Sequence, residues 1–284
     1  EITSDAAKLT GLKKGIPVAV GASDNHSEAL GSGVVKPGQL SIGTGTGSCW
    51  ITPLTEPKVD IKRRVNCMRH VIPNTWVYET GINATGASLA WFKNNFGYRE
   101  VEESKKKGVS PYACFDKLAD EIELGCDGLF YYPYLWGARS PVFNPRDGGS
   151  GPGFLHWHTK AHFVRSIMEG VAFQYLGTFE IFEDLGIKIK KITMVGGETN
   201  SELWNQMKAN ILNKPIHIPE INQAAALGSA ILAGVSAGMY NNAEDGIKNA
   251  VKFRKIYESE KSQHKKYKRI YRKYIKHNKV LKEP

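Results

Sequence analysis

The spacing of apolar residues along the chain predicts an alternation of strands and helices. Short apolar or alternating runs predict strands at residues 16–21, 71–78, 191–195 and 216–218, and a hairpin with a Gly-rich loop at residues 39–52. Apolar residues spaced three or four apart predict helices at residues 86–92, 160–183 and 224–239, and another that starts at Asn200 or Ser201. This order of elements is typical of an α/β fold with some antiparallel hairpins.

Three segments predict features of the surface and of the C-terminus. Residues 99–110 are highly charged and are interpreted as a solvated surface segment, whereas residues 128–136 form a rigid aromatic stretch before a Pro- and Gly-rich loop. From Tyr267 to Ile275, apolar residues recur at intervals of three and four between Lys and Arg residues. This tail is therefore predicted to be an amphipathic helix whose aromatic stripe packs on the body of the protein.

The net charge of +10 suggests a nucleic-acid partner, but its distribution argues against one. From Lys248 to the end, the sequence holds 14 of the 38 Lys and Arg residues and only 3 of the 28 Asp and Glu residues. The rest of the chain is close to neutral, so its charge does not indicate an extended basic surface for nucleic acid. The basic tail is left as the one segment that could bind nucleic acid or a membrane surface.

The cysteines and the lengths of the apolar runs bear on the cellular compartment. Cys49, Cys67, Cys114 and Cys126 include no CxxC pair, and we interpret them as free thiols in a reducing compartment. No apolar run reaches the ~18–20 residues that span a bilayer, and the first residues contain no signal-peptide core. We therefore expect a cytoplasmic protein without a membrane partner. Because the first residue is not Met, a fragment or a processed product is expected.

The loop of the predicted hairpin is the first candidate for chemistry. It holds Gly43, Thr44, Gly45, Thr46 and Gly47, where backbone N–H groups and hydroxyls can face an anion such as phosphate. No GK[ST] follows, so the loop is not a P-loop, and a strand rather than a helix follows, unlike a dinucleotide-binding fingerprint. A plain hairpin turn is the alternative.

Two further candidates lie at the ends of predicted strands. Gly196 and Gly197 separate the strand at 191–195 from a helix, so the backbone can approach a ligand beside the free N–H groups of that helix. Asp24 follows the strand predicted at 16–21, and carboxylates at strand ends in α/β folds often face a ligand crevice. Close packing is the alternative for the two glycines, and a helix cap is the alternative for Asp24.

A cluster of histidines offers a weaker metal-site hypothesis. His156 and His158 could share one strand face as metal ligands, with His162 nearby. They lack an evident third or fourth ligand, and no GxSxG, HExxH or EF-hand motif is present. The sequence therefore predicts no protein-bound metal site.

The motifs, taken in order, resemble the C-terminal half of the FGGY carbohydrate kinases. VAVGASDNHSEALGSGVVKPGQLSIGTGTGS (18–48) is similar to the family's Gly-x-x-Asp turn, A-L-G helix and Gly-Thr phosphate hairpin. Further similar segments are TGINATGASLAWFKNNFG (80–97), DGLFYYPYLWGARSPVFNP (127–145), HFVRSIMEG (162–170), VGGETNSELWNQMKANILNKPI (195–216) and AAALGSAILAG (224–234).

The resemblance implies an α/β fold of the actin/hexokinase/Hsp70-like (ribonuclease H-like) type. Its features would be a mixed sheet flanked by helices and a C-terminal amphipathic helix. Residues 1–15 would be the end of a preceding domain or a hinge, residues 16–255 the actin-like domain, and residues 256–284 the basic helix.

The resemblance also implies residue roles in phosphoryl transfer from ATP with Mg²⁺. Asp24 would be the general base that takes the proton from the attacking sugar hydroxyl. Phosphate oxygens would be held by Thr44, Gly45 and Thr46, with Gly86 near the β- and γ-phosphates. The adenosine pocket would be lined by Gly196, Gly197 and Asn200, with Ser201 nearby. Mg²⁺ would bridge the phosphates without a protein metal site.

Two departures from the family pattern affect these expectations. Glu198 stands where a third glycine is usual, so its side chain would either narrow the adenine pocket or point to solvent. The family's preceding domain, with its Asp-x-Gly-Thr turn and most sugar contacts, does not occur in these 284 residues. The chain is therefore expected to be part of a longer kinase or one partner of a split one, and to be inactive alone.

The acceptor is expected to be a sugar or polyol. RHVIPNTW (69–76) resembles xylulokinases, which favours D-xylulose, whereas the GASD turn (21–24) is also similar to gluconokinases. Gluconate and then other polyols are the alternatives. A non-catalytic nucleotide-binding or regulatory protein is the alternative class, which Asp24 disfavours because binding alone needs no base. A homodimer is left open.

Overall fold

One seven-stranded mixed sheet organises the protein. The computed structural model describes residues 1–280, and its strand order is β3-β4-β2-β1-β5-β6-β7. Strands β1, β5 and β6 are parallel, whereas β2, β3, β4 and β7 pair antiparallel with their neighbours. The strands are β1 (Gln39–Thr44), β2 (Ser48–Leu54), β3 (Asn66–Arg69), β4 (Trp76–Ile82), β5 (Lys191–Gly196), β6 (Ile216–Pro219) and β7 (Phe253–Tyr257).

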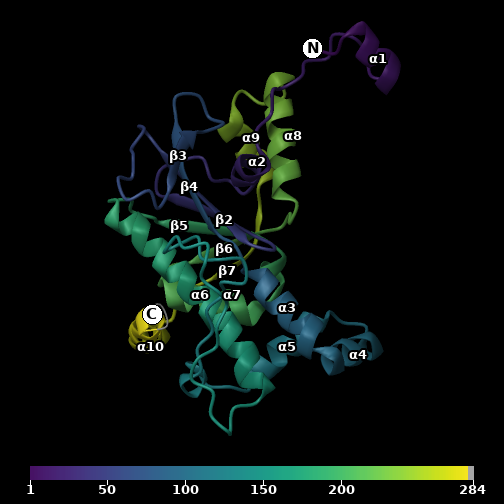
Figure 1. The fold of residues 1–284 in the computed structure, drawn as a ribbon. Coiled ribbons are helices and arrows are strands. Elements are labelled where there is room, and N and C mark those ends of the chain that lie inside the picture. Colours follow the sequence, from purple (N-terminus) through teal and green to yellow (C-terminus); the bar gives the residue numbers. More distant parts are fainter. Residues whose placement is uncertain (281–284) are drawn as a thin grey trace.

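Helices lie on both sides of this sheet (Figure 1). The first group is α2 (Asp24–Gly31), α8 (Ala224–Ser236) and α9 (Ala243–Ala250). The opposite group is α6 (Lys160–Asp184), α7 (Glu202–Leu212) and α10 (Lys261–Val280). Further out on the side of α6 and α7 lie α3 (Gly86–Phe96), α4 (Tyr98–Lys107) and α5 (Pro111–Asp120), and α1 (Ser4–Thr10) stands apart near the N-terminus. The predicted mixed sheet flanked by helices is thus confirmed.

The long helix α6 is the centre of the core. It begins at a capping box, in which the Thr159 hydroxyl and the His162 ring each face the other's backbone. Most of its side chains are buried, including Val164, Met168 and Val171 on the predicted apolar face. The periodicity therefore predicted the helix correctly, but residues 164–179 are buried on every side of the helix and not on one face alone.

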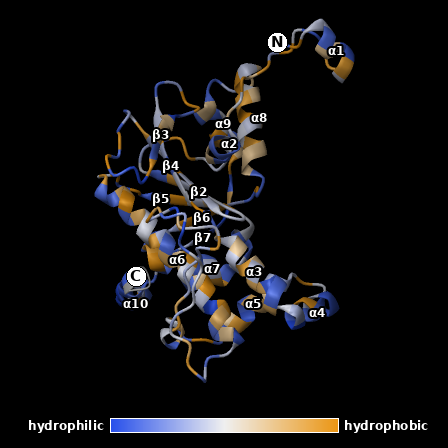
Figure 2. Ribbon diagram, in the orientation of Figure 1, coloured by the Kyte–Doolittle hydropathy of each residue, from blue (hydrophilic) through white to orange (hydrophobic). Residues whose placement is uncertain are grey.

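The basic tail folds as α10 and packs on the body. Tyr267, Tyr271 and Tyr274 are buried, and the Tyr274 hydroxyl accepts a hydrogen bond from Gln174 Nε2 at 2.7 Å. Figure 2 shows the hydrophilic residues concentrated on α10 and α4, away from the sheet. The aromatic stripe was thus predicted correctly as a packing surface.

The strand predicted at residues 16–21 was wrong. Residues 16–21 have no regular secondary structure, and Val18 and Val20 are exposed. Within residues 1–280 no strand pairs with this segment. An apolar run becomes a buried strand only where a neighbour supplies hydrogen bonds and a core face, and neither is present between α1 and α2.

Other differences are smaller. The strand predicted at 71–78 is displaced, because residues 71–75 form a turn and β4 starts at Trp76. The charged segment 99–110 lies at the surface as predicted, mostly in the helix α4. The pattern did not predict α1, α5, α9 or β7. Within the described residues, no helix is both long enough and apolar enough to cross a membrane.

Candidate functional site

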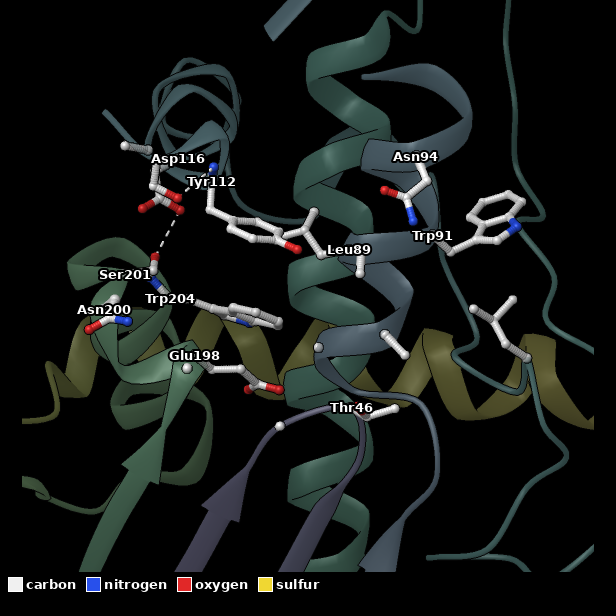
Figure 3. Close-up of a pocket in the computed structure, with 18 of the residues that line it drawn as sticks. Thr46, Leu89, Trp91, Asn94, Tyr112, Asp116, Glu198, Asn200, Ser201 and Trp204 are labelled. Carbon is white, nitrogen blue, oxygen red and sulfur yellow. Dashed lines mark hydrogen bonds between the residues drawn. The ribbon is translucent and has the colours of Figure 1, made fainter. Parts of the chain in front are cut away.

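A cavity of about 950 Å³ opens beside the carboxyl ends of β1 and β5 (Figure 3). Carboxyl ends of adjacent parallel strands are the usual ligand position in α/β sheets. Its walls are the β1–β2 turn, the helices α3 and α5, residues 135–136, the segment between β5 and α7, and the start of α7. Its lining includes Gly45, Thr46, Gly86, Leu89, Trp91, Asn94, Tyr112, Asp116, Gly197, Glu198, Asn200, Ser201 and Trp204.

The β1–β2 turn is fixed against the start of α3. The Thr46 carbonyl accepts hydrogen bonds from the N–H groups of Thr85 (3.1 Å) and Ala87 (3.0 Å). A Cβ on Gly86 would lie 2.3 Å from the Gly45 carbonyl oxygen, so the two backbones meet too closely for any side chain there. The β1–β2 turn therefore carries only small side chains, and a ligand can approach its backbone closely.

The second glycine turn is equally constrained. Gly196 has φ 94°, and a Cβ there would lie 1.8 Å from the Thr44 carbonyl oxygen. Gly197 has open space at its Cβ position and faces the cavity. Gly196 therefore allows β5 to end against β1, and Gly197 leaves room in the cavity wall.

Six of the nine residues predicted for the site line this one cavity. They are Gly45, Thr46, Gly86, Gly197, Asn200 and Ser201.

Thr44 and Gly196 do not line the cavity. The Thr44 hydroxyl donates to the Val195 carbonyl at 2.7 Å and so holds β1 to β5. The backbone of Gly196 packs against Thr44 in the parallel pairing of the two strands.

Asp24 also lies outside the cavity lining, at the exposed start of α2. Its Oδ1 accepts a hydrogen bond from the Asn25 N–H at 2.8 Å, and Ser23 is the N-cap. One turn later, burial and then the charge of Asp24 raise the pKa of Glu28 to about 7. The exposed carboxylate of Asp24 and the half-buried carboxylate of Glu28 therefore lie one turn apart on α2.

In the far wall of the cavity, the predicted Ser201 contacts Asp116, a residue that sequence reasoning missed. The Ser201 hydroxyl caps α7 by accepting from the Trp204 N–H at 3.0 Å and donates to Asp116 Oδ1 at 2.8 Å. Burial raises the pKa of Asp116, and the hydrogen bond from Ser201 opposes that rise. Asp116 comes from α5, whose Ser110 cap followed by proline at the first helical position was an available helix-start signal.

Glu198 lies in the floor of the cavity and does not point to solvent (Figure 3). Its Oε2 accepts hydrogen bonds from the Lys208 ammonium at 2.5 Å and from the Tyr175 hydroxyl at 3.1 Å. Lys208 is completely buried, which lowers its pKa while the carboxylate opposes that change. Oε1 is buried with no hydrogen-bond partner. The side chain therefore narrows the cavity and brings a carboxylate into it.

The histidine cluster has other roles in the structure. His162 Nδ1 accepts from the Thr159 N–H at 3.1 Å in the capping box, and His158 Nδ1 accepts from the Leu155 N–H at 3.0 Å. Residues 1–280 contain no group of three His, Cys, Asp or Glu side chains suited to a metal ion.

A glycine-lined cavity at the carboxyl ends of parallel strands is typical of α/β domains that bind ligands, and this chain has that arrangement. Residues 40–237 match the model of the FGGY family of carbohydrate kinases, C-terminal domain. The chain is 32% identical over 235 residues to a gluconokinase of Bacillus licheniformis, which covers 82% of this chain and 46% of that protein. It is also 32% identical over 240 residues to a xylulose kinase of Bacillus subtilis, covering 84% and 46%. The chain belongs to the FGGY family of carbohydrate kinases and corresponds to its C-terminal domain.

Solved structures show the same fold. The xylulose kinase of Rhodospirillum rubrum superposes with a TM-score of 0.86 at 27% identity, covering 98% of this chain and 54% of that one. The gluconate kinase of Lactobacillus acidophilus gives a TM-score of 0.88 at 22% identity, covering 99% and 55%. The fold is thus the actin/hexokinase-like fold of these sugar kinases. The chain spans about half the length of the relatives that it matches.

Proposed function

We propose that this chain is the nucleotide-binding half of an ATP-dependent sugar kinase. The observation that carries the proposal is the convergence of six separately predicted residues, from three chain segments, around one cavity. Phosphoryl transfer depends mainly on positioning and on charge stabilisation, which a rigid glycine-lined cavity can supply.

The two ends of the cavity fit the two ends of ATP. At the β1–β2 turn, the backbone of Gly45 and the hydroxyl of Thr46 would hold phosphate oxygens, with Gly86 close by. A Cβ at Gly86 would collide with Gly45, so this part of the wall stays bare for phosphate. At the other end, Asn200 and Ser201 would line the adenosine pocket. Bound Mg²⁺ would supply charge neutralisation on the phosphates.

Asp24 is proposed as the general base. Its carboxylate would take the proton of the acceptor hydroxyl as the oxygen attacks the γ-phosphate. An exposed position at the start of α2 supports this role, because the carboxylate is free to meet a substrate from outside the nucleotide cavity.

The proposed acceptor is D-xylulose, with gluconate as the alternative. Both choices have support, since a xylulose kinase and a gluconokinase match the chain at equal identity. The segment at 69–76, which resembles xylulokinases, places the xylulose proposal first. Most of the acceptor contacts are proposed to come from an N-terminal family domain, in the same chain or in a separate one. The chain alone is therefore proposed to be inactive.

The experiment compares the 284-residue chain with a protein that also supplies the N-terminal domain. We expect ATP-dependent phosphorylation of D-xylulose, measured by coupled release of ADP, only when both domains are present. Asp24→Asn in the two-domain protein should lower kcat by about 10²–10⁴-fold, as is typical for loss of a general base, while ATP still binds. Asp5→Asn, an exposed carboxylate in α1, is the matched control.

Three results would contradict parts of this proposal. Full turnover by the 284 residues alone would remove the need for a partner domain. Normal kcat for Asp24→Asn would remove Asp24 as the base. ATP binding without transfer to any sugar would favour the regulatory alternative.

A further inference from the structure

The Glu198 carboxylate has one satisfied oxygen and one free oxygen. Oε2 accepts from Lys208 Nζ at 2.5 Å and from the Tyr175 hydroxyl at 3.1 Å. Oε1 has no partner although the residue is only 6% exposed. A buried acceptor without a donor costs free energy and calls for an explanation such as a bound ion or ligand. Glu198 also lines the cavity, so a ligand bound there is the nearest candidate for the missing partner.

The free oxygen lies at the phosphate end of the cavity. A Cβ on Gly86 would lie 3.6 Å from Glu198 Oε1, and the same Cβ would lie 2.3 Å from the Gly45 carbonyl oxygen. In Figure 3 the Glu198 side chain extends toward Thr46 and away from Tyr112 and Asp116. Oε1 therefore faces the Gly45–Gly86 contact and not the adenosine end.

The negative charge of the Glu198 carboxylate limits which ligand Oε1 can bind. A carboxylate oxygen beside phosphate oxygens is repulsive unless a cation lies between them. Mg²⁺ is commonly held by one or two carboxylates together with substrate phosphates and water. Since the described residues contain no group of three metal-ligating side chains, such an ion would have to come with the nucleotide.

We propose that Glu198 Oε1 binds the divalent cation that accompanies the nucleotide phosphates, directly or through one water molecule. The inference rests on the proposed nucleotide site. Lys208 and Tyr175 are positioning residues, because they hold Oε2 and so keep Oε1 on the side of Gly86, in the wall of the cavity. The buried Lys208 also pairs with Glu198 and so offsets part of the cost of burying its charge.

The test is calorimetric titration of the chain with ADP, once with Mg²⁺ and once with EDTA. We expect Mg²⁺ to increase ADP affinity for the unaltered chain. Glu198→Gln should reduce that gain roughly 10–100-fold, the range typical of lost support to a metal, without weakening ADP binding in EDTA. The double variant E198Q/K208M removes both buried charges and keeps the test decisive if the single variant unfolds. Glu202→Gln, at the exposed start of α7, is the matched control and should bind as the unaltered chain does.

Each other outcome overturns the proposal in a distinguishable way. Equal loss of ADP affinity with and without Mg²⁺ would mean that Glu198 contacts the nucleotide itself, for example a ribose hydroxyl. Unchanged binding in both conditions would mean that Oε1 has no ligand role. If the unaltered chain binds no ADP in either condition, the proposed nucleotide site fails, and this inference fails with it.

Discussion

At the scale of single residues, the carboxylate of Glu28 in α2 lies against Gly43 of β1. A Cβ on Gly43 would lie 1.7 Å from Glu28 Oε1, so the Glu28 carboxylate packs directly on the backbone of β1. Burial first, and the charge of Asp24 second, raise the pKa of Glu28 to about 7, from 4.5 as the ordinary value. Folding therefore favours the neutral form of Glu28.

Glu28→Gln should make the effect visible as a pH dependence of stability. The stability from neutral Glu28 is fully present below pH 4.5 and is lost as the pH rises through about 7. As the pH rises from 4.5 to 7, the free energy of unfolding of the variant should therefore increase relative to that of the unaltered chain. The increase over this range should be roughly 1–3 kcal/mol.

Urea denaturation at a series of pH values measures this difference. Glu56→Gln, at an exposed turn residue, is the matched control for the loss of one carboxylate. A stability difference between Glu28→Gln and the unaltered chain that stays constant from pH 4.5 to 7 would contradict the prediction.

At the scale of elements, α2 and α8 cross with their backbones in contact. A Cβ on Gly228 would lie 1.8 Å from the Ser27 carbonyl oxygen, and one on Gly31 would lie 1.9 Å from the Ala224 carbonyl oxygen. The many Ala and Gly residues of α8 suit such close packing, but the sequence does not identify the partner. Because α2 begins at Asp24, this crossing also fixes where the proposed base lies.

Gly228→Ala should force α2 and α8 apart. An overpacked contact costs about 1–3 kcal/mol or more, since the obstacle is a backbone carbonyl that cannot rotate away. We expect a lower midpoint of urea denaturation for this variant. Gly148→Ala places the same methyl group in open space and should change the midpoint little. Equal midpoints for the two variants would show that the helices separate without cost.

How far the sequence predicts each element depends on whether its signals are local. The helix at 160–183 and the hairpin at 39–52 were predicted almost to their ends, because periodicity, caps and glycine loops lie within each segment. The strand at 16–21 was wrong because pairing depends on a neighbour that the pattern cannot show. In the site, the glycine turns were predicted, whereas the contact of Asp116 with Ser201 joins residues far apart in the sequence.

At the scale of the whole molecule, charge and packing separate on the two faces of α10. Tyr267, Tyr271 and Tyr274 are buried against the body, whereas the Lys and Arg residues between them are exposed. The Tyr132 hydroxyl donates to the Tyr274 carbonyl at 2.7 Å, which ties α10 to the aromatic stretch at 128–136. Deleting residues 256–284 would therefore remove part of the core, so it cannot test the basic charge alone.

Neutralising exposed charges on α10 separates its packing role from any role of its positive charge in binding. We expect the fourfold variant with glutamine at residues 265, 266, 269 and 273 to keep its stability within roughly 0.5 kcal/mol per substitution, because these side chains are exposed. Tyr274→Ala, by contrast, should lower the free energy of unfolding by about 3–5 kcal/mol, as truncation of a buried aromatic does.

The unaltered chain should show no saturable binding to duplex DNA at physiological salt, measured by fluorescence anisotropy. Tight, steeply salt-dependent binding that the fourfold variant loses would instead make α10 a polyanion-binding surface.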